Sequence, residues 1–489
     1  MKIRMLAAML AVIAPLSAYA QVRAFTGATV IDGNGGAPIR NGVVLTDGKL
    51  IKAVGPASRV TIPSGAERID VSGKYVLPGF IDGNVHLVPW PSWAYIEFLA
   101  RYEGNFEGIA EEAGQIGLKH GFTTVFDSMG PLHPLVKVRD RINRGETDGP
   151  RLFVAGDIVG FRAVFTTVEA MKSATPAFQA RINELFELNG GQDLPWKSPE
   201  QIKTEMTKYV AEGADFVKFG ATGDGKPVNS EIGQDAVLRF SPDQQRAMVE
   251  AVHAAGKIIQ THQTSAEALQ VVVEAGVDMA QHCAHTGPSR IYDKTIKLML
   301  QRKFYCGTQW APLSEEVEKD LKQGKFSGGG SDAQNGQEGV DYGVENAVRL
   351  IKAGVPEFLS TDAGTIDPDV ATDPKNYGGL GGQSSLIGEA EFVEMKAMHQ
   401  RGMTPMMVIQ ASTRNVAAAY HKLDQFGTLE AGKSADLVVL DADPLADIEN
   451  MRSVSMVVKE GRTVNRDALP THPLLTSAEA THPGPVRVK

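Results

Sequence analysis

The 489-residue sequence has few cysteines, no run of basic residues and, beyond its first twenty residues, no long apolar run. Two cysteines, Cys283 and Cys306, are too few for a disulfide framework. They fall on strands that we expect to be neighbours, which leaves a bridge open, but we expect buried free thiols. The net charge of −9 and the lack of Lys and Arg clusters argue against a nucleic-acid partner, because phosphate binding needs clustered positive charge.

Residues 1–20 have the order of a secretory signal peptide. Lys2 and Arg4 precede an apolar run, and small residues end the segment at Ala20. We therefore expect cleavage after Ala20 and export, to a bacterial periplasm. A membrane anchor would need about 20 apolar residues, and no later stretch reaches that length, so we expect no membrane span after signal cleavage.

The rest of the chain divides by its sequence patterns. Short β-like runs with Gly-rich turns occupy residues 21–76 and recur at 416–466, whereas strand and helix patterns alternate at 77–415. Strands beginning near residues 76, 122, 151, 215, 257, 278, 303 and 357 supply the eight that an α/β fold of the (β/α)8 TIM barrel type needs. The Pro-rich segment 467–489 lacks periodicity and is expected to be an extended or disordered tail.

Capping signals mark the helices of this middle segment. Ser198 and Ser241 each precede Pro and lie three residues before Gln, as in a capping box. Thr264 opens another such box, and Thr404 precedes the Pro of the last helix. Glycines are expected to end three helices: Gly213, Gly256 and Gly276. Long loops at 160–197, 324–346 and 363–390 are expected at the carboxyl ends of strands, where barrel enzymes build their pockets, and we expect 324–346 to be mobile.

Residues 77–86 carry the first candidate site. Asp82, Asn84 and His86 occupy alternate positions after a Pro-Gly break, so their side chains leave one face of a strand. Alone, this pattern fits a metal-binding face and an ordinary strand with a hydrogen-bonded histidine about equally well. Four later strand-like runs also end in a base or a hard ligand: Lys218, His262, His282 and Asp362. Candidates on separate strand ends favour one shared metal site.

The order His86, Lys218, His262, His282, Asp362 on successive strand ends resembles the metal-dependent amidohydrolase superfamily. Most members have His-x-His where this sequence has Asn84 and His86, and the Asn-x-His form is similar to the phenylurea and molinate hydrolases. Imidazolonepropionase and Xaa-Pro dipeptidase-like members are further relatives. The resemblance implies that the two terminal segments close into a small discontinuous β-sandwich domain beside the barrel.

The resemblance also implies a cofactor, one or two divalent cations with Zn²⁺ favoured, bound by His86, His262, His282 and Asp362. Lys218 lies between apolar neighbours, where desolvation disfavours its ammonium, and the resemblance implies that it adds CO₂ to form a carbamate that bridges two metals. Asp362 matches the family's aspartate, which moves a proton from water to the leaving nitrogen. Asn84 offers only a neutral amide oxygen, so we expect a weak metal ligand or none.

Side chains near the strand ends are candidates for substrate binding: Trp90, Trp93, His133, Arg162 and His285. Aromatic walls suit an apolar or aryl substrate, although aromatic residues of barrel loops more often pack on their own loop. We expect a homo-oligomeric enzyme that cleaves a C–N bond of an amide, urea or carbamate in a small molecule by metal-activated hydroxide. Two alternatives stay open. One is an Xaa-Pro-type dipeptidase or carboxypeptidase, for which Arg162 could clamp the substrate carboxylate, and the other is a non-catalytic, metal-poor binding barrel.

Overall fold

A computed structural model describes residues 22–88, 100–160, 175–186, 193–222, 238–287, 289–323, 342–365 and 386–476. The expected signal segment 1–20 lies outside these ranges, and so do residues 324–341 of the expected loop 324–346, whose last residues belong to a helix that begins at Gly343. Among the described helices, none combines the length and the apolar character that crossing a membrane requires.

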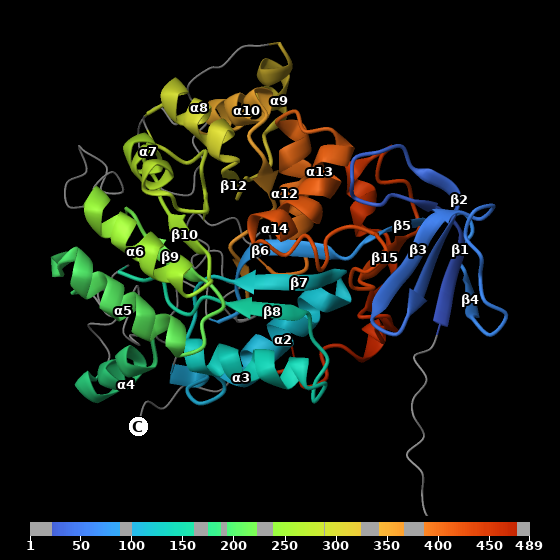
Figure 1. Cartoon of the computed structure of the whole chain (residues 1–489), viewed down its shortest axis with the longest axis horizontal. Coiled ribbons are helices and arrows are strands. Elements are labelled where there is room, and N and C mark those ends of the chain that lie inside the picture. The colour runs from blue at the N-terminus through green and yellow to red at the C-terminus, as the bar shows by residue number, and fades with distance from the viewer. Residues whose placement is uncertain are drawn as a thin grey trace, which may run out of the picture.

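Strands from both ends of the chain form one eight-stranded sheet, here named the terminal sheet (Figure 1). Its order is β17-β16-β15-β5-β1-β2-β3, with β4 paired to β1. Its strands are β1 (Val22–Val30), β2 (Ile39–Asp47), β3 (Leu50–Pro56), β4 (Glu67–Asp70), β5 (Tyr75–Pro78), β15 (Leu437–Leu440), β16 (Val454–Lys459) and β17 (Arg462–Thr463). The discontinuous β domain is therefore present, but as one hydrogen-bonded sheet where a sandwich was predicted.

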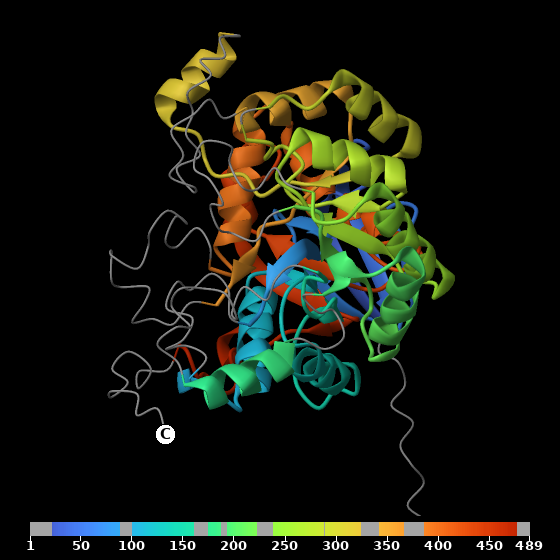
Figure 2. The same cartoon turned by 90° about the vertical axis from the view of Figure 1, so that its left-hand side faces the viewer.

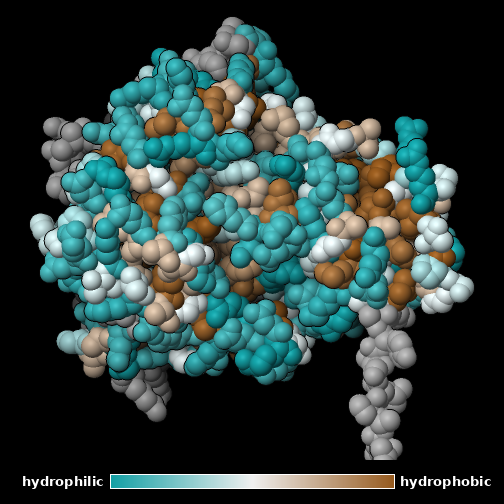
Figure 3. Space-filling view, viewed as in Figure 1, coloured by the Kyte–Doolittle hydropathy of each residue, from teal (hydrophilic) through white to brown (hydrophobic). Residues whose placement is uncertain are grey.

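The pairing of β5 with β15 joins the two ends of the chain. These strands run antiparallel, with Leu77 opposite Val438. Both side chains are fully buried, so the contact between the two strands is apolar. Each Å² of apolar surface buried there stabilises the fold by about 25 cal/mol. Hydrophobic residues also gather on the surface over the terminal sheet, at the right of Figure 3.

Two parallel sheets form the middle of the molecule. One has the order β14-β6-β7-β8 and the other β13-β12-β11-β10-β9. Their strands are β6 (Phe80–His86), β7 (Phe122–Asp127), β8 (Arg151–Val154), β9 (Val217–Gly220), β10 (Ile259–His262), β11 (Met279–Ala280), β12 (Tyr305–Gly307), β13 (Glu357–Phe358) and β14 (Ala363–Gly364). The predicted strand starts agree with these to within four residues.

Backbone hydrogen bonds join the two parallel sheets at both edges. At one edge, the N–H of Asp215 donates to the carbonyl of Val154 at 2.8 Å. At the other, the N–H of Gly83 donates to Leu359 at 2.9 Å and that of Asp362 to Asn84 at 2.8 Å. We name this closed arrangement the strand ring. The parallel α/β architecture is thus as predicted, although the ring consists of two ladders and not one continuous eight-stranded ladder.

Helices surround the strand ring (Figure 2). They are α2 (Phe106–Lys119), α3 (Leu132–Asn143), α4 (Pro176–Phe186), α5 (Pro199–Ala211), α6 (Pro242–Ala254), α7 (Ala266–Ala275), α8 (Asp293–Arg302), α9 (Glu315–Lys322), α10 (Gly343–Ala353), α12 (Ala390–Gln400), α13 (Pro405–Ala411) and α14 (Arg414–Ala419). Short 3-10 turns lie at η2 (Leu194–Trp196), η5 (Ile448–Arg452) and η6 (Arg466–Ala468). In Figure 1 the arrows of β7 and β8 point away from the terminal sheet, so the carboxyl ends of the strands lie on the far side from it.

The helix boundaries follow local chemistry. Complete capping boxes begin α5 at Ser198 and α6 at Ser241, as predicted. The cap of α7 is Ser265 and not the predicted Thr264, because the Ser265 hydroxyl accepts the N–H of Ala268. Thr404 caps α13, but α14 follows it, so that helix is not the last.

The first part of the C-terminal segment packs on α2 and is not a free tail. The buried carboxylate of Glu112 accepts the N–H groups of Leu474, Leu475 and Thr476 at 2.7, 2.8 and 2.9 Å. The side chain of Gln115, one helical turn further on, accepts the N–H of Thr471 at 2.7 Å. These bonds satisfy an irregular backbone that has no strand partner. Residues 477–489 lie outside the described ranges.

Candidate functional site

The six predicted ligand positions meet at the carboxyl ends of the strand ring. Strand β6 contributes Asn84 and His86, β9 contributes Lys218, β10 ends at His262, and His282 and Asp362 follow β11 and β13. These strands are adjacent or hydrogen-bonded to one another, and parallel strands end on the same side. Residues up to 278 positions apart in sequence therefore touch.

The Asp362 carboxylate lies at the centre of this cluster. Its Oδ1 is 3.1 Å from Nε2 of His86 and also accepts the side-chain amide of Asn84. Its Oδ2 accepts the Nε2 amide of Gln309 at 2.5 Å and lies 3.5 Å from Nε2 of His282. Burial alone would raise the pKa of Asp362, but the neighbouring imidazoles and the Lys218 ammonium lower it well below its usual range. Asp362 is therefore an ionised carboxylate in a dry site.

Lys218 is almost completely buried beside this carboxylate. Its Nζ donates to the side-chain oxygen of Asn84 at 3.1 Å, and only 1% of its surface is exposed. Burial lowers the pKa of Lys218, because desolvation disfavours the ammonium, and Asp362 and Asp127 offset this only in part. The neutral, nucleophilic form of the amine therefore forms more readily here than on the surface.

Burial favours the neutral form of the imidazoles of the cluster. Burial lowers the pKa of His262 to about 3 and that of His282 well below its ordinary value, and it also lowers the pKa of His86. The rings of His262 and His282 meet edge to face, with centroids 5.1 Å apart. Within the described residues, the buried Nδ1 of His282 has no hydrogen-bond partner. Neutral imidazole is the form that binds metals.

These donors fit a divalent cation in kind, since neutral imidazoles and an ionised carboxylate are ligands of Zn²⁺ and similar ions. As they stand, no three His, Cys, Asp or Glu side chains in the described part of the chain converge closely enough to bind an ion. The Asp362 oxygens are instead in hydrogen bonds with His86, Asn84 and Gln309. A bound cation would replace some of these bonds.

Asp82 does not join the ligand cluster, contrary to the pattern of alternate residues on β6. Its Oδ1 accepts the N–H of Asn84 at 2.9 Å and that of Thr361 at 3.3 Å, and its Oδ2 accepts the Thr361 hydroxyl at 2.6 Å. Burial raises the pKa of Asp82 to about 7. Its backbone and hydroxyl partners occupy the carboxylate, so Asp82 ties β6 to the turn that carries Asp362.

Three residues of the site have left-handed backbone conformations. The φ angles of His282, Gln309 and Asp362 are 56°, 68° and 53°. Such conformations cost non-glycine residues about 1–3 kcal/mol each and persist where surrounding contacts enforce them. Gln309, which the sequence did not single out, shares this feature with two predicted ligands. A lone Gln after a short strand carries no sequence signal that would have identified it.

The two cysteines form a disulfide, so the expectation of free thiols was wrong. Cys306 lies on β12 opposite Ala280 of β11, and Cys283 follows β11 directly after His282. Their Cα atoms are 5.6 Å apart, within the usual range for a disulfide. Burial had favoured free thiols, but neighbouring parallel strands bring the two side chains together. The bridge fastens the strand end that carries His282.

The predicted substrate-binding residues have different locations. His285 lies beside the cluster, with its ring centroid 6.1 Å from that of His282. His133 is exposed on α3, where Nε2 contacts Oε2 of Glu212 at 3.1 Å, in the outer helix layer. Trp90, Trp93 and Arg162 lie outside the described residues.

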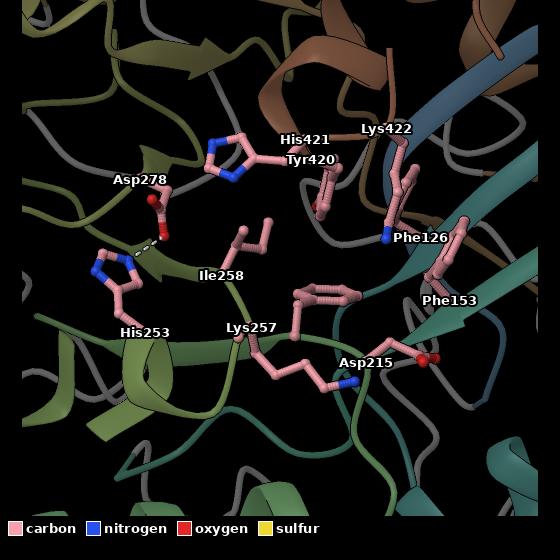
Figure 4. Close-up of a pocket in the computed structure, with 12 residues that line it drawn as sticks. Phe126, Phe153, Asp215, His253, Lys257, Ile258, Asp278, Tyr420, His421 and Lys422 are labelled. Carbon is pink, nitrogen blue, oxygen red and sulfur yellow. Dashed lines mark hydrogen bonds and ion pairs between the residues drawn. The ribbon is translucent and has the colours of Figure 1, made fainter. Parts of the chain in front are cut away.

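A cavity of about 450 Å³ opens at the opposite end of the strand ring (Figure 4). Residues that precede β9, β10 and β11, namely Asp215, Lys257 and Asp278, contribute to its wall. Its aromatic floor includes Phe126 and Tyr420, which stack with centroids 3.6 Å apart. None of the predicted ligands lines this cavity, so we place the candidate active site at the carboxyl ends, where parallel α/β enzymes build theirs.

The parallel strand ring and the buried His, Lys and Asp cluster at its carboxyl ends define an α/β enzyme of the hydrolase class. A model described as "Amidohydrolase family" matches residues 75–464, and the chain belongs to that family of enzymes, which act on C–N bonds.

Two solved structures are similar over nearly the whole chain. A structure of molinate hydrolase is 35% identical, with a TM-score of 0.82, over 96% of this chain and 99% of that one. A structure of phenylurea hydrolase B is 34% identical, with a TM-score of 0.83, over 94% and 100%. Ochratoxinase from Aspergillus niger is a more distant relative, 23% identical over 87% of this chain and 83% of its own length. The predicted family and the predicted resemblance to molinate and phenylurea hydrolases are thus confirmed.

Proposed function

We propose that this enzyme hydrolyses a C–N bond of an amide, urea or carbamate in a small molecule with an apolar or aryl group, using a bound divalent cation, Zn²⁺ in the first instance. The observation that carries the proposal is the ionised Asp362 carboxylate in contact with His86 and His282 beside the buried Lys218. The similarity to molinate hydrolase and phenylurea hydrolase B supports the substrate class.

The cation would be held by the neutral imidazoles of His86, His262 and His282, by Asp362 and by Lys218 after carbamate formation. Once bound, it supplies a water of lowered pKa and polarises the carbonyl group of the substrate. For the carbamate, the neutral Nζ of Lys218 forms a bond to the carbon of CO₂ and releases one proton. The Lys218 side chain would then be an anionic oxygen donor, and the cost of burying a lysine ammonium would be removed.

Asp362 is the proton carrier of the proposed reaction. Its ionised carboxylate takes a proton from the attacking water and passes it to the nitrogen of the leaving group. Asn84 contributes differently, because its amide donates to Asp362 and its oxygen accepts from Lys218. We infer that Asn84 orients these two side chains and is at most a weak ligand of the cation.

The test combines elemental analysis of the purified protein with a panel of anilides, phenylureas, carbamates and Xaa-Pro dipeptides. We expect bound divalent metal and turnover of at least one of the first three classes. Asp362→Asn should lower kcat by at least about 100-fold, because the proton acceptor is lost. Asp243→Asn, an exposed residue in the first turn of α6, is the control and should leave kcat unchanged.

Two results would reject this proposal in favour of its alternatives. Turnover of dipeptides alone would identify a dipeptidase, and Arg162→Ala should then raise KM for the substrate carboxylate. A protein with neither metal nor turnover on any compound would be a binding barrel.

We also propose that the mature protein is exported to a periplasm and is a homo-oligomer. The signal-like order of residues 1–20 supports export, and the Cys283–Cys306 disulfide suits an oxidising compartment. N-terminal sequencing of the periplasmic fraction should begin at Gln21, and light scattering after gel filtration measures the oligomeric state.

A further inference from the structure

Gln309 follows β12, and its side chain contacts the carboxylate of Asp362. Its Nε2 donates to Oδ2 of Asp362 at 2.5 Å, whereas Nε2 of His282 lies farther away, at 3.5 Å. The opposite oxygen, Oδ1, is in contact with Asn84 and His86. Contacts on both oxygens fix the rotation of the carboxylate, so each oxygen has a defined direction.

The backbone at Gln309 is held by a buried carboxyl group from another element. Glu394, on α12, accepts the N–H of Gln309 at 2.5 Å through Oε1, and the same oxygen accepts the hydroxyl of Thr308. The Thr308 N–H donates to the carbonyl of Phe358 at 3.1 Å, and the Thr308 hydroxyl oxygen lies at the same distance from that carbonyl oxygen. These bonds enforce the left-handed conformation of Gln309, whose φ is 68°. A conformation that most residues avoid is thus maintained where it aims this amide at Asp362.

We propose that Gln309 is a positioning residue, whose amide holds Oδ2 of Asp362 in the direction of proton transfer while Glu394 holds Gln309 in place. This inference rests on the proposed function, in which Asp362 carries the proton. A carboxylate that must face first water and then a leaving nitrogen loses rate when it is misplaced by as little as about 1 Å.

Two variants of similar size test the hydrogen bond. Gln309→Leu removes the donor, and Gln309→Glu keeps the shape but places a second carboxylate against Asp362. We expect kcat to fall by about 10- to 100-fold in Gln309→Leu, the usual effect of losing a hydrogen bond to a charged group, and further in Gln309→Glu. KM should stay within about twofold of the parent, because Gln309 contacts the Asp362 carboxylate and not the substrate. Metal content should be unchanged, because Gln309 is not one of the proposed ligands.

A matched control perturbs the same loop without touching Asp362. Gln400, also on α12, accepts the N–H of Leu313 at 2.8 Å, four residues beyond Gln309. Gln400→Leu should lower the thermal stability of the protein but leave kcat within about twofold of the parent. If Gln400→Leu lowered kcat as much as Gln309→Leu, loosening of the loop would explain both, and the positioning role would be wrong. Equal kcat values for Gln309→Glu and the parent would also overturn it.

A crystal structure of Gln309→Leu gives a result that does not depend on activity. The Asp362 carboxylate should rotate about its Cβ–Cγ bond or lose definite orientation, while the rings of His86, His262 and His282 stay in place. An unchanged Asp362 would reject the inference. If Asp362 rotated but the parent hydrolysed nothing on the panel, the proposed function would fail and the positioning of Asp362 by Gln309 would stand.

Discussion

Loss of the Cys283–Cys306 disulfide should lower the stability of the protein by a predictable amount. The cysteines are 23 residues apart, and closing a loop of that length removes unfolded-state entropy worth about 3 kcal/mol at 25 °C. Unfolding entropy of about 2.1 cal/mol/K per residue over 489 residues amounts to about 1 kcal/mol/K, so Tm should fall by about 3 °C if the chain unfolds as one unit.

Scanning calorimetry of Cys306→Ala and of the double variant Cys283→Ala/Cys306→Ala checks this expectation. Both lack the bridge, so the single variant should already show most of the loss, and the second substitution should add only the packing loss of one buried sulfur. The difference between the two variants therefore estimates the packing loss of one sulfur, and subtracting it from the loss in the single variant leaves the effect of the cross-link. A Cys306→Ala protein with the Tm of the parent, or two reactive thiols in the unreduced, denatured parent, would refute the argument.

The disulfide also bears on the site, because Cys283 directly follows His282. The His282 carbonyl keeps its bonds from Gln263 at 3.1 Å and from the His285 N–H at 2.8 Å after the bridge is removed. We therefore expect metal to be retained but to leave faster in the presence of a chelator. An unchanged rate of metal release would show that these hydrogen bonds suffice to hold His282.

Three further predictions concern the cluster and its surroundings. Lys218→Ala should strip metal and activity, measured by elemental analysis and turnover, because the oxygen donor of the proposed carbamate would be lost. Short carboxylic acids should partly restore the rate. Full metal content with full turnover would exclude the carbamate. Asn84 is a weaker metal ligand than His, so one metal ion should be retained through dialysis and a second should raise turnover when it is added back, as measured by metal titration with an activity assay. Two ions bound equally tightly would contradict this expectation. Burial raises the pKa of Glu394 to about 8 from its ordinary 4.5, so the folded protein retains a proton that the unfolded chain releases, and stability falls as pH rises from about 5 to 8. Glu394→Gln has no titrating group at this position, so its Tm relative to that of the parent should rise between pH 5 and pH 9, by an amount that corresponds to on the order of a few kcal/mol. A difference in Tm that stayed constant with pH would show that Glu394 does not titrate in this range.

Local patterns in the sequence were sufficient for the order of the elements. The alternation of strand and helix signals predicted the parallel strands, and Ser198 and Ser241 marked the helix starts at which the capping boxes form. Such signals depend on neighbours within a few residues, so a single sequence contains all of their chemistry. The predicted ligands could be listed for a related reason, since each follows a short apolar strand and parallel strands end on one side.

Tertiary structure decided which of these polar residues meet and what holds them. Hydrogen bonds join Gln309 to Asp362, 53 residues apart, and Thr361 to Asp82, 279 residues apart. Another joins Thr476 to Glu112, 364 residues apart. No local pattern specifies such pairs, because a hydrogen bond depends on two side chains meeting at about 3 Å after the chain has closed into the strand ring. The disulfide belongs to the same group: the two cysteines were visible in the sequence, but only the register of β11 against β12 brings their Cα atoms within 5.6 Å. Short-range chemistry therefore determined the elements and the donor types, and long-range packing determined their geometry.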